Sequence, residues 1–89
     1  MVRLYFHTFN GEGDTRDDEG IELEDDHAAY SIALENIRSI VADEARRGLI
    51  DLEGHIDVAD GEGQLVLLVP FVEAFDLKLP DGDEEWSDR

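Results

Sequence analysis

The sequence predicts an α+β fold in which a small antiparallel sheet of three or four strands packs one face against one long helix, with the elements in the order β-β-α-β-β. Three segments lead to this prediction. Residues 2–9 are rich in aromatic and β-preferring side chains, residues 26–47 repeat apolar side chains at helical spacing, and residues 55–71 hold two strand-like runs around a glycine-rich turn. A sheet that buries one face under a helical layer satisfies both kinds of pattern.

The first segment, "VRLYFHTF", stops at Asn10-Gly11, so it predicts a strand that ends in a turn. Side chains alternate between the two sides of a strand, which divides the segment into a core face and an outer face. The core face takes Val2, Leu4 and Phe6, and the outer face takes Arg3, Tyr5 and His7.

An acidic segment follows, with nine carboxylates and one arginine between Phe9 and Asp26. Its middle, Asp14 to Glu19, is predicted to be a solvated loop. The alternation in "EGIEL", around Ile21 and Leu23, indicates a short second strand that anchors the chain before the helix.

The spacing of these carboxylates does not match a calcium loop. An EF-hand needs Gly at position 6 and a bidentate Glu at position 12, between two helices. Counted from Asn10, those positions hold Thr15 and Ile21, and a strand precedes them. We therefore expect no ordered metal site, although clustered carboxylates attract divalent cations weakly.

Residues 26–47 predict the helix, because their apolar side chains recur at steps of three and four. Asp25 or Asp26 can cap its N-terminus, and Gly48 follows a basic last turn and suits the C′ position. The stripe expected to face the sheet consists of Tyr30, Ala33, Leu34, Ile37, Val41 and Ala45.

The runs "HIDVA" and "QLVLLVPF" predict a hairpin around the turn Asp60 to Gly63, with Ile56 and Val58 facing the helix. The second run is apolar on both sides. Its core face takes Leu65, Leu67 and Val69, and its outer face takes Val66 and Leu68. After Pro70, the residues expected to pack back on the core are Phe71, Val72 and Phe75.

The domain prediction is one α+β domain over residues 1–79, followed by an acidic tail, residues 80–89, that is disordered in isolation.

The formal net charge of −17 excludes nucleic acid backbones and anionic membranes as expected ligands, because each phosphate contact needs a Lys or Arg and the chain has seven. No cysteine is present, which removes disulfides, thiolate chemistry and cysteine-ligated zinc. The N-terminal segment has no secretory signal pattern. We expect a cytoplasmic protein without a cofactor.

The three histidines, His7, His27 and His55, lack the four-residue spacing of a helical zinc motif. Two interpretations stay open: partly exposed strand residues, or a cluster of His7, His55 and Asp57. No serine sits in a nucleophile elbow, and the abundant carboxylates specify no acid and base pair. We therefore expect a protein that is not an enzyme.

The outer face of the predicted sheet carries apolar side chains that one helix cannot cover. This predicts a protein-interaction or regulatory module that forms a homodimer or binds a partner, with basic partner surfaces favoured. A nucleic-acid mimic that occupies a basic groove is the alternative, and a weak divalent-cation binder is the second alternative. The expected interaction surface consists of Tyr5, His7, Val66, Leu68, Asp14, Asp17, Asp18 and Glu19.

The order of "RLYFH", "DDEGIEL", the helix and "GLIDLEGHIDVADGEGQLVLLVPF" resembles a family of short bacterial proteins, mainly alphaproteobacterial, known as a domain of unknown function. The resemblance covers residues 3–74. It implies a small α+β domain in the bacterial cytoplasm, and it brings no activity, cofactor or catalytic residue. The acidic tail and the charge of the first loop depart from the family pattern.

Overall fold

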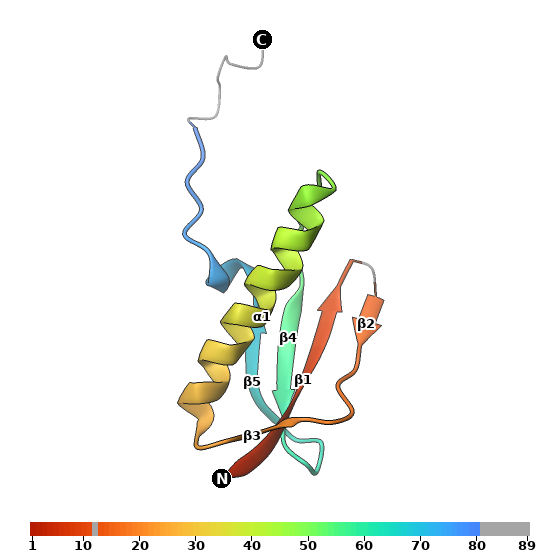
Figure 1. Cartoon of the computed structure of the whole chain (residues 1–89), viewed down its shortest axis with the longest axis vertical. Coiled ribbons are helices and arrows are strands. Elements are labelled where there is room, and N and C mark those ends of the chain that lie inside the picture. Colours follow the sequence, from red (N-terminus) through yellow and green to blue (C-terminus); the bar gives the residue numbers. More distant parts are fainter. Residues whose placement is uncertain (12, 81–89) are drawn as a thin grey trace.

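The computed structural model describes residues 1–11 and 13–80, and in them one α-helix packs on one face of a five-stranded antiparallel sheet (Figure 1). The elements in chain order are β1 (Val2–Asn10), β2 (Gly13–Thr15), β3 (Ile21–Leu23), α1 (Asp26–Arg46), β4 (His55–Ala59), β5 (Leu65–Pro70) and the 3₁₀-helix η1 (Phe71–Ala74). The α+β class with a single α-helix is therefore confirmed, whereas the predicted tail, residues 80–89, lies outside the described part except for Pro80.

The sheet has one strand more than predicted, because the acidic segment contains β2. Both short strands pair with β1. β2 pairs with one end of it, where Gly13 lies opposite Asn10, and β3 pairs with the other end, where Ile21 lies opposite Leu4. β4 pairs with the opposite edge of β1, and β5 pairs with β4. β1 has nine residues and the two strands have three each, so β1 is long enough to hold both along one edge.

The core lies between α1 and the sheet. Alanines of α1 let the helix backbone approach the strands closely, and each fully buried Ile, Val or Phe side chain contributes about 1.5–3 kcal/mol from its removal from water. The buried side chains are Leu4, Phe6, Leu23, Ala29, Ala33, Ile37, Val41, Ile56, Val58, Val69, Phe71 and Ala74.

The two ends of α1 follow the predicted capping chemistry. The Asp25 carboxylate accepts the N–H of Ala28 at 3.0 Å, and Gly48 has a φ of 90° after the last turn. The buried stripe differs at its end, where Ala45 is exposed and Glu44 is buried. The buried residues follow one another from Ala29 to Val41 in four-residue steps. At 100° per residue, a fourth such step would place Ala45 roughly 160° around the helix axis from Ala29, away from the sheet.

A bulge in β5 changes which side chains face the core. Val58 pairs with Leu67, but Ala59 pairs with Leu65, so Val66 is the extra residue. Val66 is half-buried and packs against the core, whereas Leu65 is exposed, which reverses the predicted sides of these two residues. A β-bulge shifts the alternation by one residue in this way.

The segment after β5 returns to the core as predicted, with one exception. Phe71 is fully buried and Phe75 packs against the core, but Val72 is exposed. A 3₁₀-helix has three residues per turn, so Phe71 and Ala74 share the buried side and Val72 points away.

Candidate interaction surface

No described helix covers the sheet face opposite α1, although Arg16 and Gly63 from neighbouring loops lie over part of it. The segment after β5 could have covered it, but η1 lies beside α1 instead (Figure 1). Two contacts hold it there: the Tyr30 hydroxyl donates to Glu73 Oε1 at 3.0 Å, and Arg38 Nε donates to the Ala74 carbonyl at 2.9 Å. We call this uncovered side the open face.

The strand register shows which side chains share the open face. Residues directly opposite each other on neighbouring strands point to the same side, with their Cβ atoms about 4.5–5.5 Å apart. The rows are Tyr5, Ala59 and Leu65; His7, Asp57 and Leu68; and Asp14, Phe9, His55 and Pro70. Leu65 is 56% and Leu68 51% exposed, so two large apolar side chains on this face meet solvent.

Of the residues expected to form an interaction surface, Tyr5, His7, Leu68 and Asp14 lie on the open face. Val66 does not, because the bulge packs it against the core. Phe9, His55 and Leu65 were not expected there. Leu65 could not have been identified, since an apolar run gives no sign of the bulge, whereas alternation from His7 points to Phe9.

The histidine and aspartate cluster that the sequence left open is assembled on this face. Asp57 lies opposite His7 in the strand register, and its Oδ1 is 3.4 Å from His55 Nε2. That Oδ1 is buried and accepts no hydrogen bond from a described residue, so the 3.4 Å contact lacks hydrogen-bond alignment. The His55 ring stacks on Phe9, with ring centroids 4.9 Å apart.

A small polar cavity of about 160 Å³ lies at this cluster, lined by His7, Phe9, Arg16, Asp57, Ala59, Gly63 and Leu65. Its chemistry is mixed, with two carboxylate oxygens, one guanidinium and one imidazole. Within residues 1–11 and 13–80, no three His, Asp or Glu side chains converge in a way that could hold a metal ion.

The acidic loop has one carboxylate that belongs to the fold. Asp17 Oδ2 accepts the N–H of Phe6 at 3.0 Å, and its Oδ1 accepts the N–H groups of Glu19 and Gly20 at 3.1 Å each. Its own N–H donates to His7 Nδ1 at 3.1 Å. The prediction of a solvated loop over residues 14–19 is therefore wrong at Asp17 and also at Asp14 and Thr15, which lie in β2. Asp14, Asp18 and Glu19 are exposed.

These bonds set the ionisation of Asp17. Partial burial raises the pKa of its carboxyl, but the N–H groups of Phe6, Gly20 and Glu19 together outweigh that effect, with a smaller contribution from His7. The net pKa is lowered from the ordinary value of 3.8. Aspartates commonly accept N–H groups two and three residues later in turns, but Asp14 and Asp18 have the same sequence context, so this signal does not single out Asp17.

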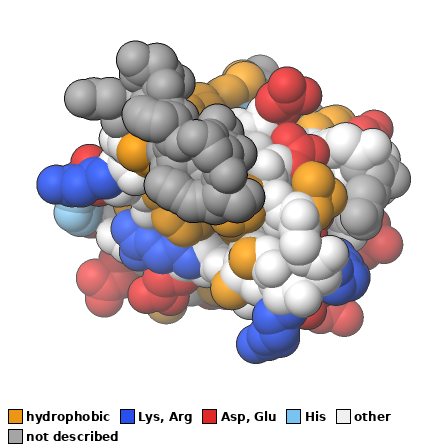
Figure 2. Space-filling view, turned by 90° about the horizontal axis from the view of Figure 1, so that it is seen from above, with side chains coloured by type: hydrophobic (Ala, Val, Ile, Leu, Met, Phe, Trp, Pro, Cys, Tyr) orange, Lys and Arg blue, Asp and Glu red, His pale blue; other side chains and the backbone are white. Residues whose placement is uncertain are grey.

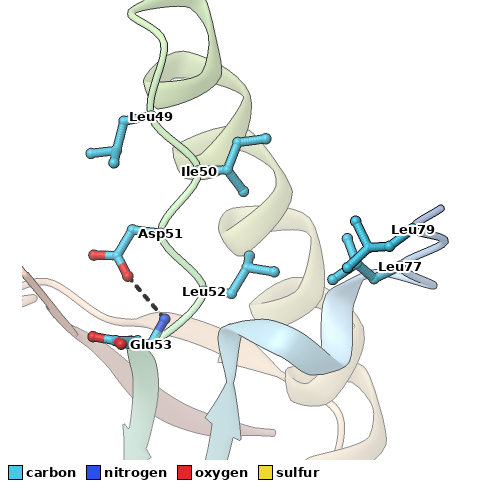
Figure 3. A pocket seen from close by; sticks show the side chains of 7 residues that line it. All are labelled: Leu49, Ile50, Asp51, Leu52, Glu53, Leu77 and Leu79. Carbon is cyan, nitrogen blue, oxygen red and sulfur yellow. Dashed lines mark hydrogen bonds between the residues drawn. The ribbon is translucent and has the colours of Figure 1, made fainter. Parts of the chain in front are cut away.

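A second apolar surface lies on another part of the molecule, between the segment after α1 and the segment after η1 (Figure 3). Its leucine and isoleucine side chains line an open groove of about 620 Å³, and Figure 2, which looks down on this end, shows hydrophobic side chains at the surface among charged ones. We call it the leucine groove, and it consists of Leu49, Ile50, Asp51, Leu52, Glu53, Leu77 and Leu79.

The comparisons with known proteins place this fold in a family. Within the described residues no helix has the length and apolar character needed to cross a membrane. No curated protein and no solved structure matches the chain. Residues 3–72 match the model of a family described as a domain of unknown function, DUF6894, which is the greater part of the chain. The protein therefore belongs to the DUF6894 family.

Proposed function

We propose that this protein is a non-enzymatic protein-interaction or regulatory module that binds a protein partner through the open face. The observation that carries the proposal is the exposure of Leu65 and Leu68 on the same sheet face as Tyr5 and Phe9, a face that no described helix covers. Two-layer domains normally leave a polar outer face, and aromatic and aliphatic side chains on one mark a contact site.

The charge of the chain indicates what kind of partner fits. A net charge of −17 on 89 residues produces a negative potential that attracts basic surfaces and speeds their association. Asp14 extends the open face with an exposed carboxylate, and Asp18 and Glu19 lie exposed in the neighbouring loop. A partner with Lys or Arg around an apolar centre would match this arrangement.

The size of the polar cavity argues against a catalytic pocket there, and the larger leucine groove is lined mainly by aliphatic side chains. Pockets for small molecules are typically about 300–1,000 Å³ in volume, and the cavity beside His7 and Asp57 has about 160 Å³. The same charge allows a nucleic-acid mimic, but a mimic needs rows of outward carboxylates at phosphate spacing. Asp17 weakens such a row because its carboxylate is turned to Phe6.

The experiment that tests the proposal is quantitative affinity capture from a lysate of the source organism, with nuclease added. The bait is the full chain as wild type, as Leu68→Glu, or as Ile50→Glu. Ile50 lies in the leucine groove and is 62% exposed, so its variant adds the same charge to another apolar surface. Thermal unfolding checks that each bait is folded.

We expect a partner rich in Lys and Arg that Leu68→Glu loses and Ile50→Glu retains. Equal retention by both variants, or a loss confined to Ile50→Glu, would contradict the open face as the contact site. Displacement of the captured protein by duplex DNA would favour the nucleic-acid mimic instead.

A further inference from the structure

The free edge of β5 differs from the other edge of the sheet. Among the described residues β5 pairs only with β4, whereas β2 and β3 occupy the opposite edge next to β1. β5 has six residues, "LVLLVP", none of them charged. Edge strands of isolated domains commonly carry charged side chains, because their unpaired backbone groups can otherwise accept a further strand.

The register shows which backbone groups of β5 are free. The Phe71 N–H donates to the Gly54 carbonyl at 2.9 Å, at the end of the β4–β5 ladder. Hydrogen-bonded and non-hydrogen-bonded pairs alternate along an antiparallel ladder, so Val69 and Leu67 bond toward β4 and Leu68 turns its N–H and C=O outward. Pro70 also lies at an outward position, so its missing N–H leaves the ladder with β4 intact, and an added strand would find only its C=O there.

The side chain of Leu68 joins this edge to the open face. Leu68 lies opposite Asp57 in the register and is half exposed. A strand added to β5 would place every second side chain on the side of the open face, and one of these side chains would lie next to Leu68. Main-chain hydrogen bonds and an apolar contact would then occur together, as in binding by strand addition.

Charge identifies the occupant of the edge. Residues 48–77 contain seven carboxylates and neither Lys nor Arg, and Lys78 follows them. Arginines from other elements reach this region at two places, Arg38 at the Ala74 carbonyl and Arg16 at the polar cavity. The carboxylates include Asp60 and Glu62 before β5, and Glu73 and Asp76 after it.

A second copy of this chain is a poor occupant for that reason. Antiparallel pairing of two β5 strands would bring the acidic residues before one strand next to the acidic residues after the other, and like charges facing each other are destabilising. A basic strand would meet carboxylates at both ends instead.

We propose that the free edge of β5 binds an extended, basic segment of a partner protein, which adds as a further antiparallel strand next to Leu68. The inference rests on the proposed interaction function and specifies its geometry and the chemistry of the partner. Lys or Arg side chains of the segment contact the acidic flanks, and its apolar side chains contact Leu68 and Leu65.

The test uses the full chain and three synthetic peptides of about nine residues, long enough to span the six residues of β5. One alternates Val with Lys, the second alternates Val with Glu, and the third is the Lys peptide with Pro at its centre. Binding is measured by calorimetry at low and physiological salt, and amide hydrogen exchange is followed by NMR.

We expect the Lys peptide to bind, and its affinity to fall about tenfold between low and physiological salt as the surface charges are screened. The Pro peptide should bind at least about tenfold more weakly, because it cannot complete the ladder. Exchange at the Leu68 amide should slow on binding, while exchange at β2 stays unchanged. Equal binding of the Lys and Pro peptides, or protection only at the acidic loop or leucine groove, would overturn the proposal.

Two further outcomes separate this inference from the proposed function. A lysate partner that depends on Leu68, with no protection of the Leu68 amide by that partner or the Lys peptide, would overturn strand addition and leave the proposed function standing. Protection of the Leu68 amide without peptide, together with a dimer in sedimentation, would identify a second copy as the occupant and overturn the choice of a basic segment.

Discussion

The carboxylate of Asp17 accepts the backbone N–H of Phe6 at 3.0 Å, so a side chain from the acidic loop completes the edge of β1 between β2 and β3. Gly20 is part of the same arrangement. Its φ is 72°, and a Cβ there would lie 2.9 Å from both Arg3 Cγ and Tyr5 Cε2. Asp17 and Gly20 therefore hold the acidic loop against β1, the first by hydrogen bonds and the second by its lack of a side chain.

Asp17→Ala should destabilise the protein, because it leaves three N–H groups without their acceptor and that of Phe6 is partly buried. The expected loss in the free energy of unfolding is about 1–3 kcal/mol. Asp18→Ala is the matched control, because Asp18 is exposed and the substitution removes the same charge. It should change the free energy of unfolding by less than about 0.5 kcal/mol. Urea unfolding followed by circular dichroism measures both, and equal effects would show that only net charge matters.

The pH dependence of stability should differ between the wild type and Asp17→Asn. The pKa of Asp17 is lowered in the folded protein, so its carboxylate contributes stability above the ordinary value of 3.8. That contribution is lost as the pH falls through the folded pKa. The stability difference between the two proteins should therefore be constant near neutral pH and shrink below 3.8. Urea midpoints over acidic pH measure it, and a constant difference down to the lowest pH would contradict the assignment.

Local chemistry explains which parts of the fold could be predicted from the sequence. Asp25 caps α1 through a neighbour three residues away, and the alternation of "HIDVA" places Ile56 and Val58 in the core, so neither depends on distant parts of the chain. Capping and alternation are properties of short windows.

The candidate site depends on long-range pairing, which short windows do not contain. The eight carboxylates between β1 and α1 look alike in the sequence, and the pairing of β1 with both β2 and β3 is what brings Asp17 to Phe6. Likewise Leu65 and Val66 are both apolar, so their pattern gave no sign of the bulge opposite Ala59.

Gly54 should tolerate no side chain, because the backbone of β1 and a core ring lie against it. A Cβ at Gly54 would be 2.5 Å from the Phe9 carbonyl oxygen and 3.1 Å from Phe71 Cε2. Gly54→Ala should cost about 1–3 kcal/mol or more of stability through overpacking. At Gly61 an added Cβ meets nothing within 4 Å and φ is not positive, so Gly61→Ala should be neutral or stabilise by up to about 1 kcal/mol. Thermal unfolding of the pair decides, and a tolerated alanine at residue 54 would show that β1 and β4 can separate there.

Glu44 is the buried charged side chain of the core, with 4% of its surface exposed, and its Oε1 has no hydrogen-bond partner among the described residues. A buried acceptor without a partner costs about 1–3 kcal/mol. Glu44→Met keeps the length and the helix propensity of the side chain while it removes both oxygens, so it should raise the free energy of unfolding by about that amount.

Glu35→Met is the control for the Glu44 variant, because Glu35 is exposed on the same helix and its substitution removes the same charge. If relief of charge repulsion alone were responsible, both variants would gain equally. We expect a gain at residue 44 that exceeds the gain at residue 35, seen as a rise of about 4–8 °C in Tm per kcal/mol for a domain of this size. A loss of stability in Glu44→Met would show that the Glu44 carboxylate is solvated or paired in solution and contributes to the packing of α1 on the sheet.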